Sequence, residues 1–471
     1  MKNQILVISS VVLVLIGNCV LPTISSAQKI TAGADFCLVI CSESTAMSWG
    51  YNFKGQLGNG SNTDSNVPVQ VSSLNDVITI AAGGMYSLAL KDDSIVWSWG
   101  WNAKGQLGNG TNTDTNVPVQ VSALTSIIAI AGGGSHALAI KSDGTVWSWG
   151  LNYWGQLGNG DTTDSNVPVQ VNSLTGIIAI AGGDFNSIAL KNDGTVWTWG
   201  WNISGQLGNG NNTNSNVPVQ VSSLTDIIVI AAGGDHCLAL KNDGTVWTWG
   251  NNYYGQLGNG TNTNSNVPVQ VSGITSVTAI AGGKYHSLAV KDDGTGWAWG
   301  SNNYGKLGNG TYTSSNVPVQ VSSLTGIIAI AGGENHTVAL RNDSTVWTWG
   351  DNVFSQLGNG TNISSNVPVE VTGLCPVATS VNEITEPLSI SIFPNPASGK
   401  SFINYSLSTR AAVRVELYDL LGNKLKQLIN AEEDAGEHNA SFDAGKLANG
   451  VYLIKLFAGD QVQSKKIVVM N

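Results

Sequence analysis

Residues 177–221 read IIAIAGGDFNSIALKNDGTVWTWGWNISGQLGNGNNTNSNVPVQV, and this stretch decides the fold. It holds four short runs of apolar, β-branched and aromatic residues separated by Gly, Asn and Asp, which is typical of consecutive β-strands. Asp193 and Gly194 predict a tight hairpin between two runs, because Gly tolerates the positive φ that such turns need. Pro218 cannot donate a backbone hydrogen bond, so NVPVQV is expected at a sheet edge or beside a bulge.

The same unit recurs every fifty residues without a slip in register. Its Trp-Gly step places Gly at 50, 100, 150, 200, 250, 300 and 350, each followed by a GQLGNG-like hexapeptide. NVPVQV follows at 66–71 and in every later unit, ending as NVPVEV at 366–371. Nothing in the unit has helical periodicity. Seven copies of a four-stranded unit predict an all-β fold, a seven-bladed β-propeller over residues 28–379.

The repeated pattern AGGxxHxxAL, then DGTVWxWGxNxxGQLG, is seen complete in Ala231–Gly258. It resembles the regulator-of-chromosome-condensation repeat family, over about three quarters of the chain. This resemblance implies a seven-bladed propeller. The chain departs from the pattern at three positions: Ser355 stands where Gly is expected, Gly296 where Val is expected, and Met47 where the first Trp is expected.

The first strand of the unit has six full copies and one truncated copy, Lys29–Ala34. We expect this truncated strand to pair into the blade of Val367–Val371 and so to close the ring, which removes two free edges. Cys375 lies just past that blade. A disulfide from Cys375 to Cys41, or else to Cys37, would lock the junction; free or otherwise buried cysteines are the alternative.

Residues 1–27 have the pattern of a secretory signal peptide. Lys2 precedes an apolar run, Ile5–Ile16, and Ser25-Ser26-Ala27 supplies the small residues of a cleavage site. A lipoprotein site at Cys19 fits less well, because Asn18 precedes the cysteine; a buried strand or helix of the fold is the other alternative. Export would permit disulfides in the mature chain.

After a short polar linker, 380–387, residues 388–471 form a second domain. Alternating apolar runs predict a small immunoglobulin-like β-sandwich, at Leu388–Phe393, Val413–Tyr418, Val451–Phe457 and Lys466–Met470. The motifs FPNPA, LYDLLGNKL, LANGVYLIKL and KKIVVM resemble the type A C-terminal sorting domain of type IX secretion. The positions that carry this match are Pro394, Asn395, Pro396, Gly450, Tyr452, Lys465 and Lys466.

That resemblance implies a partner in the secretion machinery and export through the periplasm to the outside or the surface of a Gram-negative bacterium. An ordinary accessory domain is the alternative.

Two sets of repeated side chains are predicted to be structural. Equivalent register positions hold His136, His236, His286 and His336, and a ring of imidazoles is a conceivable metal site. The same register holds Phe36, Tyr86 and Asn186, which favours a shared packing or hydrogen-bonding slot.

The paired tryptophans share a strand face and are expected to pack between blades: Trp97, Trp99, Trp147, Trp149, Trp197, Trp199, Trp247 and Trp249.

Aromatic residues that vary from unit to unit follow the Trp-Gly step and suit a binding rim on the loops. They are Tyr51, Trp101, Tyr153, Trp154, Trp201, Tyr253, Tyr254, Tyr304 and Phe354. Exposed loop aromatics without a binding role are the alternative.

The net charge of −10 argues against nucleic acid as the main partner. No pattern of catalytic, metal-ligating or cofactor-binding residues stands out, and no segment is apolar enough to span a membrane. We therefore expect a secreted, non-catalytic scaffold that binds a protein or glycan. The alternative is a propeller hydrolase or lyase acting on polysaccharide. The family resemblance also brings nucleotide exchange on a nuclear GTPase, which export and acidic charge disfavour.

Overall fold

The computed structural model describes residues 5–8, 11–14, 30–41, 44–375, 389–407, 409–419, 424–458 and 461–470. The chain divides into two compact units, Met1–Cys375 and Pro376–Asn471. Ile5–Ile8 (β1) and Val11–Val14 (β2) pair as a short antiparallel sheet. The cleavage point after Ala27 and the linker 380–387 lie outside the described residues, so both stay predictions.

One fifty-residue unit builds one complete four-stranded sheet. Its strands lie side by side in chain order: Ile177–Gly182 (β15), Asn186–Lys191 (β16), Val196–Gly200 (β17) and Ser215–Gln220 (β18). Gly194 closes the β16–β17 hairpin at φ +81°. Strand β18 is the outer edge, and the β17–β18 register shifts next to it. Both placements expected for the strand with Pro218 are therefore correct.

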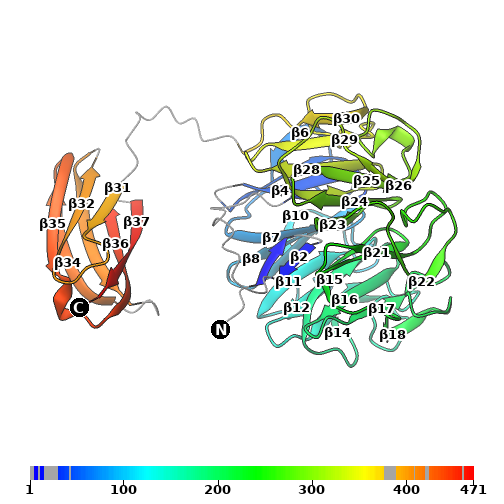
Figure 1. The fold of residues 1–471 in the computed structure, drawn as a ribbon, viewed down its shortest axis with the longest axis horizontal. Helices are drawn as coiled ribbons and strands as arrows, with labels where there is room; N and C mark the ends of the chain where they lie inside the picture. The colour runs from blue at the N-terminus through cyan, green and yellow to red at the C-terminus, as the bar shows by residue number, and fades with distance from the viewer. Residues whose placement is uncertain are drawn as a thin grey trace. The chain divides into compact units, whose positions relative to one another are not determined.

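Six further sheets repeat this order, and we number the blades 1 to 7 along the chain (Figure 1). Blade 1 holds Ile30–Ala32 (β3), Phe36–Ile40 (β4), Ala46–Gly50 (β5) and Ser65–Gln70 (β6). Blade 2 holds Val77–Ala82 (β7), Tyr86–Lys91 (β8), Val96–Gly100 (β9) and Thr115–Gln120 (β10). Blade 3 holds Ile127–Gly132 (β11), His136–Lys141 (β12), Val146–Gly150 (β13) and Ser165–Gln170 (β14).

Blade 4 is the unit described above. Blade 5 holds Ile227–Ala232 (β19), His236–Lys241 (β20), Val246–Gly250 (β21) and Ser265–Gln270 (β22). Blade 6 holds Val277–Gly282 (β23), His286–Lys291 (β24), Gly296–Gly300 (β25), a 3₁₀ turn at Asn303–Gly305 (η1) and Ser315–Gln320 (β26). Blade 7 holds Ile327–Gly332 (β27), His336–Arg341 (β28), Val346–Gly350 (β29) and Ser365–Glu370 (β30). The prediction of a seven-bladed all-β propeller is confirmed.

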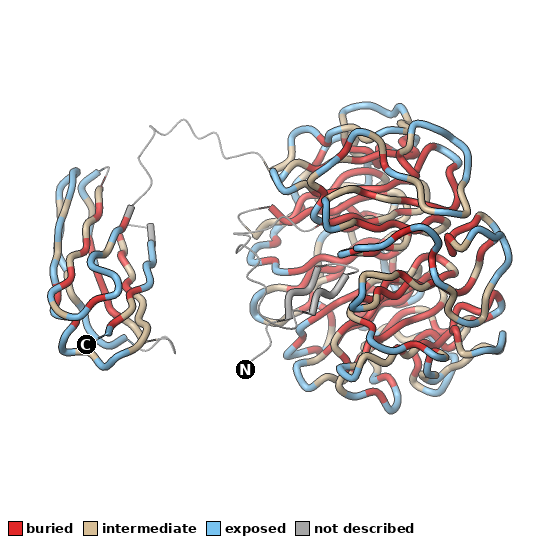
Figure 2. The backbone as a smooth tube through the Cα atoms, viewed as in Figure 1, coloured by how far each residue is buried: buried red, intermediate tan, exposed pale blue. Residues whose placement is uncertain are grey.

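Neighbouring blades pack through the Trp that precedes the last Gly of each third strand, and the buried stretches follow the inner three strands of each blade (Figure 2). Trp199 is fully buried against Ala129 and Leu138 of blade 3, and its Nε1 donates to the Gln156 carbonyl at 2.8 Å. The first Trp of the pair, Trp197, is half-buried in the same cluster. The structure places the other predicted pairs in the same way: Trp97 and Trp99, Trp147 and Trp149, Trp247 and Trp249.

The prediction of how the ring closes is wrong. Ile30–Ala32 does not pair with the blade of Val367–Val371, because it forms a hairpin with β4, its neighbour in sequence. A tight turn at Gly33 brings these two strands together, and Gly33 N donates to Phe36 O in it at 2.8 Å. Every blade is therefore continuous in sequence.

The ring closes instead by packing blade 7 face to face on blade 1. Ile30, Trp49, Ala329 and Val338 share one buried cluster across this junction. The Glu334 N–H also donates to the Ala34 carbonyl at 2.9 Å. The same donation links every blade to the next, so the seven bonds form a continuous belt around the channel.

Cys41 and Cys375 form a disulfide across the blade 7–blade 1 junction. Of the two pairings expected from the sequence, this one is confirmed. Cys37 and Cys237 are buried free thiols among the described residues.

The second unit is a sandwich of two sheets over one core. The first sheet holds Ser389–Phe393 (β31), Lys400–Leu407 (β32) and Gly436–Asp443 (β35), and the second holds Lys424–Glu433 (β34), Ala411–Tyr418 (β33), Gly450–Ala458 (β36) and Gln461–Val469 (β37). A 3₁₀ turn, Ala444–Lys446 (η2), precedes β36. Ile403, Val415 and Leu456 are fully buried between the sheets. The predicted sandwich is confirmed.

Candidate ligand-binding face

The antiparallel strand order puts two kinds of connection on one face of the propeller. In each blade the turn between the first and second strands and the long loop between the third and fourth strands meet at the same end. In blade 4, for example, Trp201 N in the loop donates to Phe185 O in the turn at 3.0 Å. We call this end of the propeller the loop face.

All nine aromatic residues predicted for the binding rim lie on the loop face. Tyr153, Tyr253, Tyr304 and Phe354 are exposed, with 66%, 72%, 49% and 39% of their surface accessible. The other five are half-buried: Tyr51, Trp101, Trp154, Trp201 and Tyr254. The sequence therefore placed these residues on one surface.

The aromatic rings gather at particular junctions between blades, which we call seams. At seam 3/4, Trp154 of blade 3 lies 6.1 Å from Trp201 of blade 4, measured between ring centroids. Tyr153 packs edge-on against Trp154 at 4.6 Å, and Phe185 against Trp201 at 5.8 Å. The four rings thus form one contiguous aromatic surface.

Two further seams carry aromatic groups. At seam 5/6, Tyr254 contacts both Tyr253 at 4.9 Å and Tyr285 at 5.7 Å. At seam 7/1, Tyr51 lies 4.8 Å from Phe354. Seam 4/5, between the first two, is polar, because Asn251 Nδ2 there donates to Ser204 Oγ at 3.3 Å.

The loop face opens into the central channel, whose mouth forms a cavity of about 590 Å³. Backbone of the repeated Ala-Gly-Gly steps lines it, together with a few side chains that differ between blades, among them Asp184, Phe185, Lys284 and Glu334. A side chain on several of these glycines would collide with a neighbouring blade; a Cβ on Gly84 would lie 2.7 Å from the Gly134 carbonyl oxygen. Variation at the mouth is therefore found at the residues just after each Gly-Gly and at a few residues of the long loops, Lys54 and Trp101.

Lys284 stands between two carboxylates at this mouth. Its Nζ lies 2.9 Å from Glu334 Oε2 and 4.0 Å from Asp184 Oδ2. Burial alone would lower the pKa of Lys284, but the hydrogen bond that it donates to Glu334 and the charge of Asp184 raise it above its ordinary value. Lys284 is therefore a cation that already has its counter-ions.

Three groups next to residues that line the mouth have shifted pKa values because they are desolvated. Burial, then the charge of Asp184, raises the pKa of Asp235 to about 7. Burial and the neighbouring Glu334 raise the pKa of Asp35 to about 6. Burial lowers the pKa of Lys306 to about 8.

The four repeated histidines fill a structural slot. Each is fully buried and reaches the next blade: His136 Nε2 lies 2.9 Å from Ser187 Oγ, and His236 Nε2 lies 2.8 Å from Ser287 Oγ. His286 contacts Thr337 and His336 contacts Cys37 in the same way. Because Ser187 Oγ donates its proton to the Gln156 carbonyl, His136 must donate from Nε2.

Burial lowers the pKa of His136 and of His236 to about 3, so both side chains are neutral. Within the described residues no group of three or more His, Cys, Asp or Glu side chains is placed to hold a metal ion.

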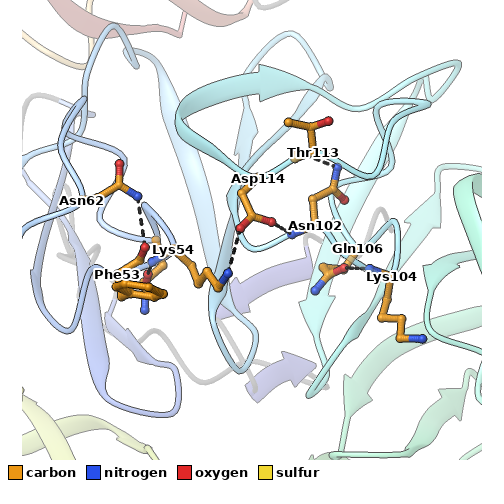
Figure 3. A network of polar contacts seen from close by, with 9 residues as sticks. Phe53, Lys54, Asn62, Asn102, Lys104, Gln106, Thr113 and Asp114 are labelled. Atoms are coloured by element: carbon orange, nitrogen blue, oxygen red, sulfur yellow. Dashed lines mark hydrogen bonds and ion pairs between the residues drawn. The ribbon is translucent and has the colours of Figure 1, made fainter.

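The Asn-rich loops hold themselves in place through their own side chains, as Figure 3 shows for blades 1 and 2. Asn102 Nδ2 donates to the Thr113 carbonyl at 3.1 Å, and Asn102 N donates to Asp114 Oδ1 at 2.8 Å. Asp114 also pairs with Lys54 of blade 1 at 3.2 Å, so the loops are linked between blades.

Sequence reasoning missed Asp184, Phe185 and Lys284, which line the mouth, and Asp235 and Tyr285, which follow lining residues in the chain. Each occupies one of the two variable positions that directly precede the His register in its unit. Variation at these positions within otherwise near-identical units is the signal that could have found them.

In the second unit, the residues of the predicted sorting motif form one junction between a loop and the last strand. Asn395, between Pro394 and Pro396, donates from Nδ2 to Lys466 O at 2.9 Å and accepts at Oδ1 from Val468 N at 2.8 Å. Gly450 opens β36, and Tyr452 Oη donates to Ala448 O at 2.9 Å. Lys465 and Lys466 are exposed on β37.

Comparisons with known proteins agree with this architecture. Residues 18–279 and 123–386 match the RCC1-like domain, and residues 391–470 match the secretion system C-terminal sorting domain. Human WBSCR16 is similar in structure, with 26% identity and a TM-score of 0.63 over 73% of this chain and 96% of that one. The yeast RCC1 protein Prp20, in a structure with Kap60, has 23% identity and a TM-score of 0.64 over 78% and 87%.

Among proteins with curated descriptions, none matches this chain. No helix in the described part of the chain has the length and apolar character needed to span a bilayer. The sorting domain directs type IX secretion, which places the protein outside the cell or on its surface. The chain belongs to the RCC1-like domain family and carries a type IX secretion sorting domain that follows its propeller in the sequence.

Proposed function

We propose that this protein is a secreted, non-catalytic scaffold that binds a protein or glycan through the loop face of its propeller. The observation that carries the proposal is the gathering of exposed aromatic rings around one channel mouth. Large aromatic side chains with polar neighbours are the groups that contribute most to recognition surfaces.

The opposite face gives a useful contrast. Its hairpin turns are small and polar, such as Asn192-Asp193-Gly194 in blade 4, where Asp193 Oδ1 accepts from Thr195 N. That bond stabilises the turn itself. These turns therefore offer a ligand little apolar surface to bury.

A role as exchange factor for a nuclear GTPase is not part of the proposal. The yeast protein Prp20 binds Kap60, Gsp1p and histones, and those partners belong to that protein. Secretion separates this chain from nuclear partners, and its net charge of −10 disfavours chromatin.

The test compares binding of the fluorescently labelled mature protein to bacterial cell surfaces with that of two variants. Tyr153→Ala/Tyr253→Ala removes two exposed rings of the loop face, and Asn192→Ala/Asn242→Ala alters the opposite face. We expect binding to fall only in the first variant. Equal loss in both would refute the choice of face, and release of new reducing ends from a bound glycan would refute the non-catalytic role.

A further inference from the structure

We propose that seams 3/4, 4/5 and 5/6 together form a binding site for an uncharged polysaccharide chain. Sugar rings would stack on the aromatic groups of the two outer seams, and hydroxyls would bind the polar groups of the seam between them. This inference rests on the proposed function and names the ligand class of its loop face.

The pattern along the three seams is aromatic, polar, aromatic. Trp154 and Trp201 lie at the first seam, Asp235 and Asn251 at the second, and Tyr254 with its neighbours at the third. Because the blades follow one another around the ring, these seams are consecutive on the loop face. Flat, half-buried rings on both sides of a polar strip suit a chain that alternates apolar ring faces with hydroxyl edges.

The residues at these positions are the ones in which near-identical units differ. Positions equivalent to Trp154 hold Lys104 and Ser204 in the adjoining units, whereas the following Gly-Gln-Leu-Gly is the same in all three. The constant residues build the loop, whereas the variable position holds an exposed Lys104, a half-buried Trp154 and a buried Ser204. The seams of the loop face therefore differ in side-chain size and polarity at this position.

Seam 4/5 contains a buried acceptor and a buried donor without partners among the described residues. Asp235 Oδ1 has no hydrogen-bond partner, and neither has Nε2 of the fully buried Gln206. The equivalent Nε2 atoms of Gln56, Gln106 and Gln156 are unpartnered too, so the unpaired acceptor on Asp235 is what distinguishes this seam at this register. The Gln206 backbone and the Asp235 carbonyl both border Gly250, which places the two residues side by side. At the same register, Gln356 Nε2 donates to Asp35 Oδ1 at 3.4 Å and Lys306 Nζ to Asn335 Oδ1 at 2.6 Å.

Gln206 thus lies beside the loop-face turn of blade 5; its counterparts Lys306 and Gln356 reach the turn of the next blade, whereas Gln256 Nε2 donates to Asn251 Oδ1 of its own loop at 2.8 Å. A hydroxyl group both donates and accepts, so it can satisfy an orphan acceptor and an orphan donor together. An apolar side chain or lipid group placed there would leave both unpaired, which is costly in a desolvated site.

The charged side chains near the site also restrict the class of ligand. An anionic polymer would have to compete with Glu334 and Asp184 for Lys284, whose charge they already balance. A cationic ligand would compete with Lys284, which already lies between Glu334 and Asp184. Burial raises the pKa of Asp235 to about 7, so its carboxyl group is partly protonated near neutral pH and suits an uncharged partner.

The experiment measures binding of the mature protein to immobilised dextran, mannan and xylan, with anionic alginate and cationic chitosan beside them. We expect at least one neutral polymer to bind better than both charged ones. Trp154→Ala/Trp201→Ala should weaken that binding about tenfold or more, and Asp235→Ala about tenfold. Tyr153→Ala, at a ring with 66% of its surface exposed, provides a variant in which folding is not at risk.

The matched controls change the equivalent positions of seam 2/3. Lys104→Ala/Leu151→Ala and Ser135→Ala should leave affinity within about twofold, with unchanged thermal unfolding. Preferential binding of alginate or chitosan would overturn the inference, as would equal losses in variants and controls. Capture of a protein by the loop face without binding of any neutral polymer would overturn it while the proposed function stands, and failure of both would refute both.

Discussion

Removal of the Cys41–Cys375 disulfide should destabilise the propeller strongly, because it links the two ends of the ring. The bond closes a loop of 334 residues. In the chain-entropy model, loss of such a crosslink costs about 6 kcal/mol at 25 °C, and removal of native disulfides commonly costs about 2–5 kcal/mol. We expect Cys41→Ser/Cys375→Ser to lower the free energy of unfolding by about 2–5 kcal/mol.

The assay is urea unfolding of the mature protein followed by Trp fluorescence. All 16 Trp residues lie between positions 49 and 349, so the signal reports the propeller and not the sorting domain. Native protein in reductant should unfold like the double variant. The control is Cys237→Ser, because Ser already occupies the same register in Ser87, Ser187 and Ser287.

The reasoning is refuted if the double variant unfolds within about 0.5 kcal/mol of the oxidised native protein. In that case the buried cluster of Ile30, Trp49 and Val338 and the Glu334–Ala34 backbone bond would hold the ring closed without the crosslink.

Four other outcomes follow from the structure. His236→Ala should cost about 2–4 kcal/mol in urea unfolding by leaving a cavity and the Ser287 hydroxyl without its partner, whereas His236→Asn should cost less, since Asn186 stands in the same slot. Burial lowers the pKa of His236 to about 3, so the unfolded chain binds more protons than the folded one between pH 6.5 and 3, and stability falls as the pH falls. His236→Asn should therefore make this fall shallower by about 1.4 kcal/mol per pH unit in acid titrations. The pKa of Asp235 is raised to about 7, so its effect on stability is the reverse: the folded state binds the extra proton, and stability falls as the pH rises. Asp235→Asn should therefore raise the thermal midpoint at pH 8 and leave it nearly unchanged at pH 4. Asn395→Ala, which removes two hydrogen bonds to β37, should increase cleavage of the second unit in limited proteolysis and reduce the amount of secreted protein, while the exposed Lys465→Ala should not increase the cleavage.

The strands that the sequence predicted well are those whose signals are local. Asp193-Gly194 and Pro218 act within a few residues of themselves, so the hairpin and the edge strand of blade 4 could be assigned without a partner. In the second unit, β34 and β35 were missed because most of their residues are exposed and carry little apolar alternation. β32 was missed because its buried face includes Ser401.

The rim aromatics were predictable because they interrupt a fixed repeat, but their grouping was not. Trp154 and Trp201 are 47 positions apart and meet only when blade 4 packs on blade 3. The charged groups at the channel mouth come from different blades, and their pKa values follow from desolvation that no single unit displays.

By itself, the sequence determined the number of blades, the strands within each blade, the face on which the variable aromatics lie, and the secretion tail. The tertiary structure decided how the ring closes. The strand Ile30–Ala32 pairs with its neighbour in sequence because a tight turn at Gly33 forms that hairpin locally. Closure is then left to side chains and to Cys41–Cys375, residues more than three hundred positions apart that only the completed ring brings into contact.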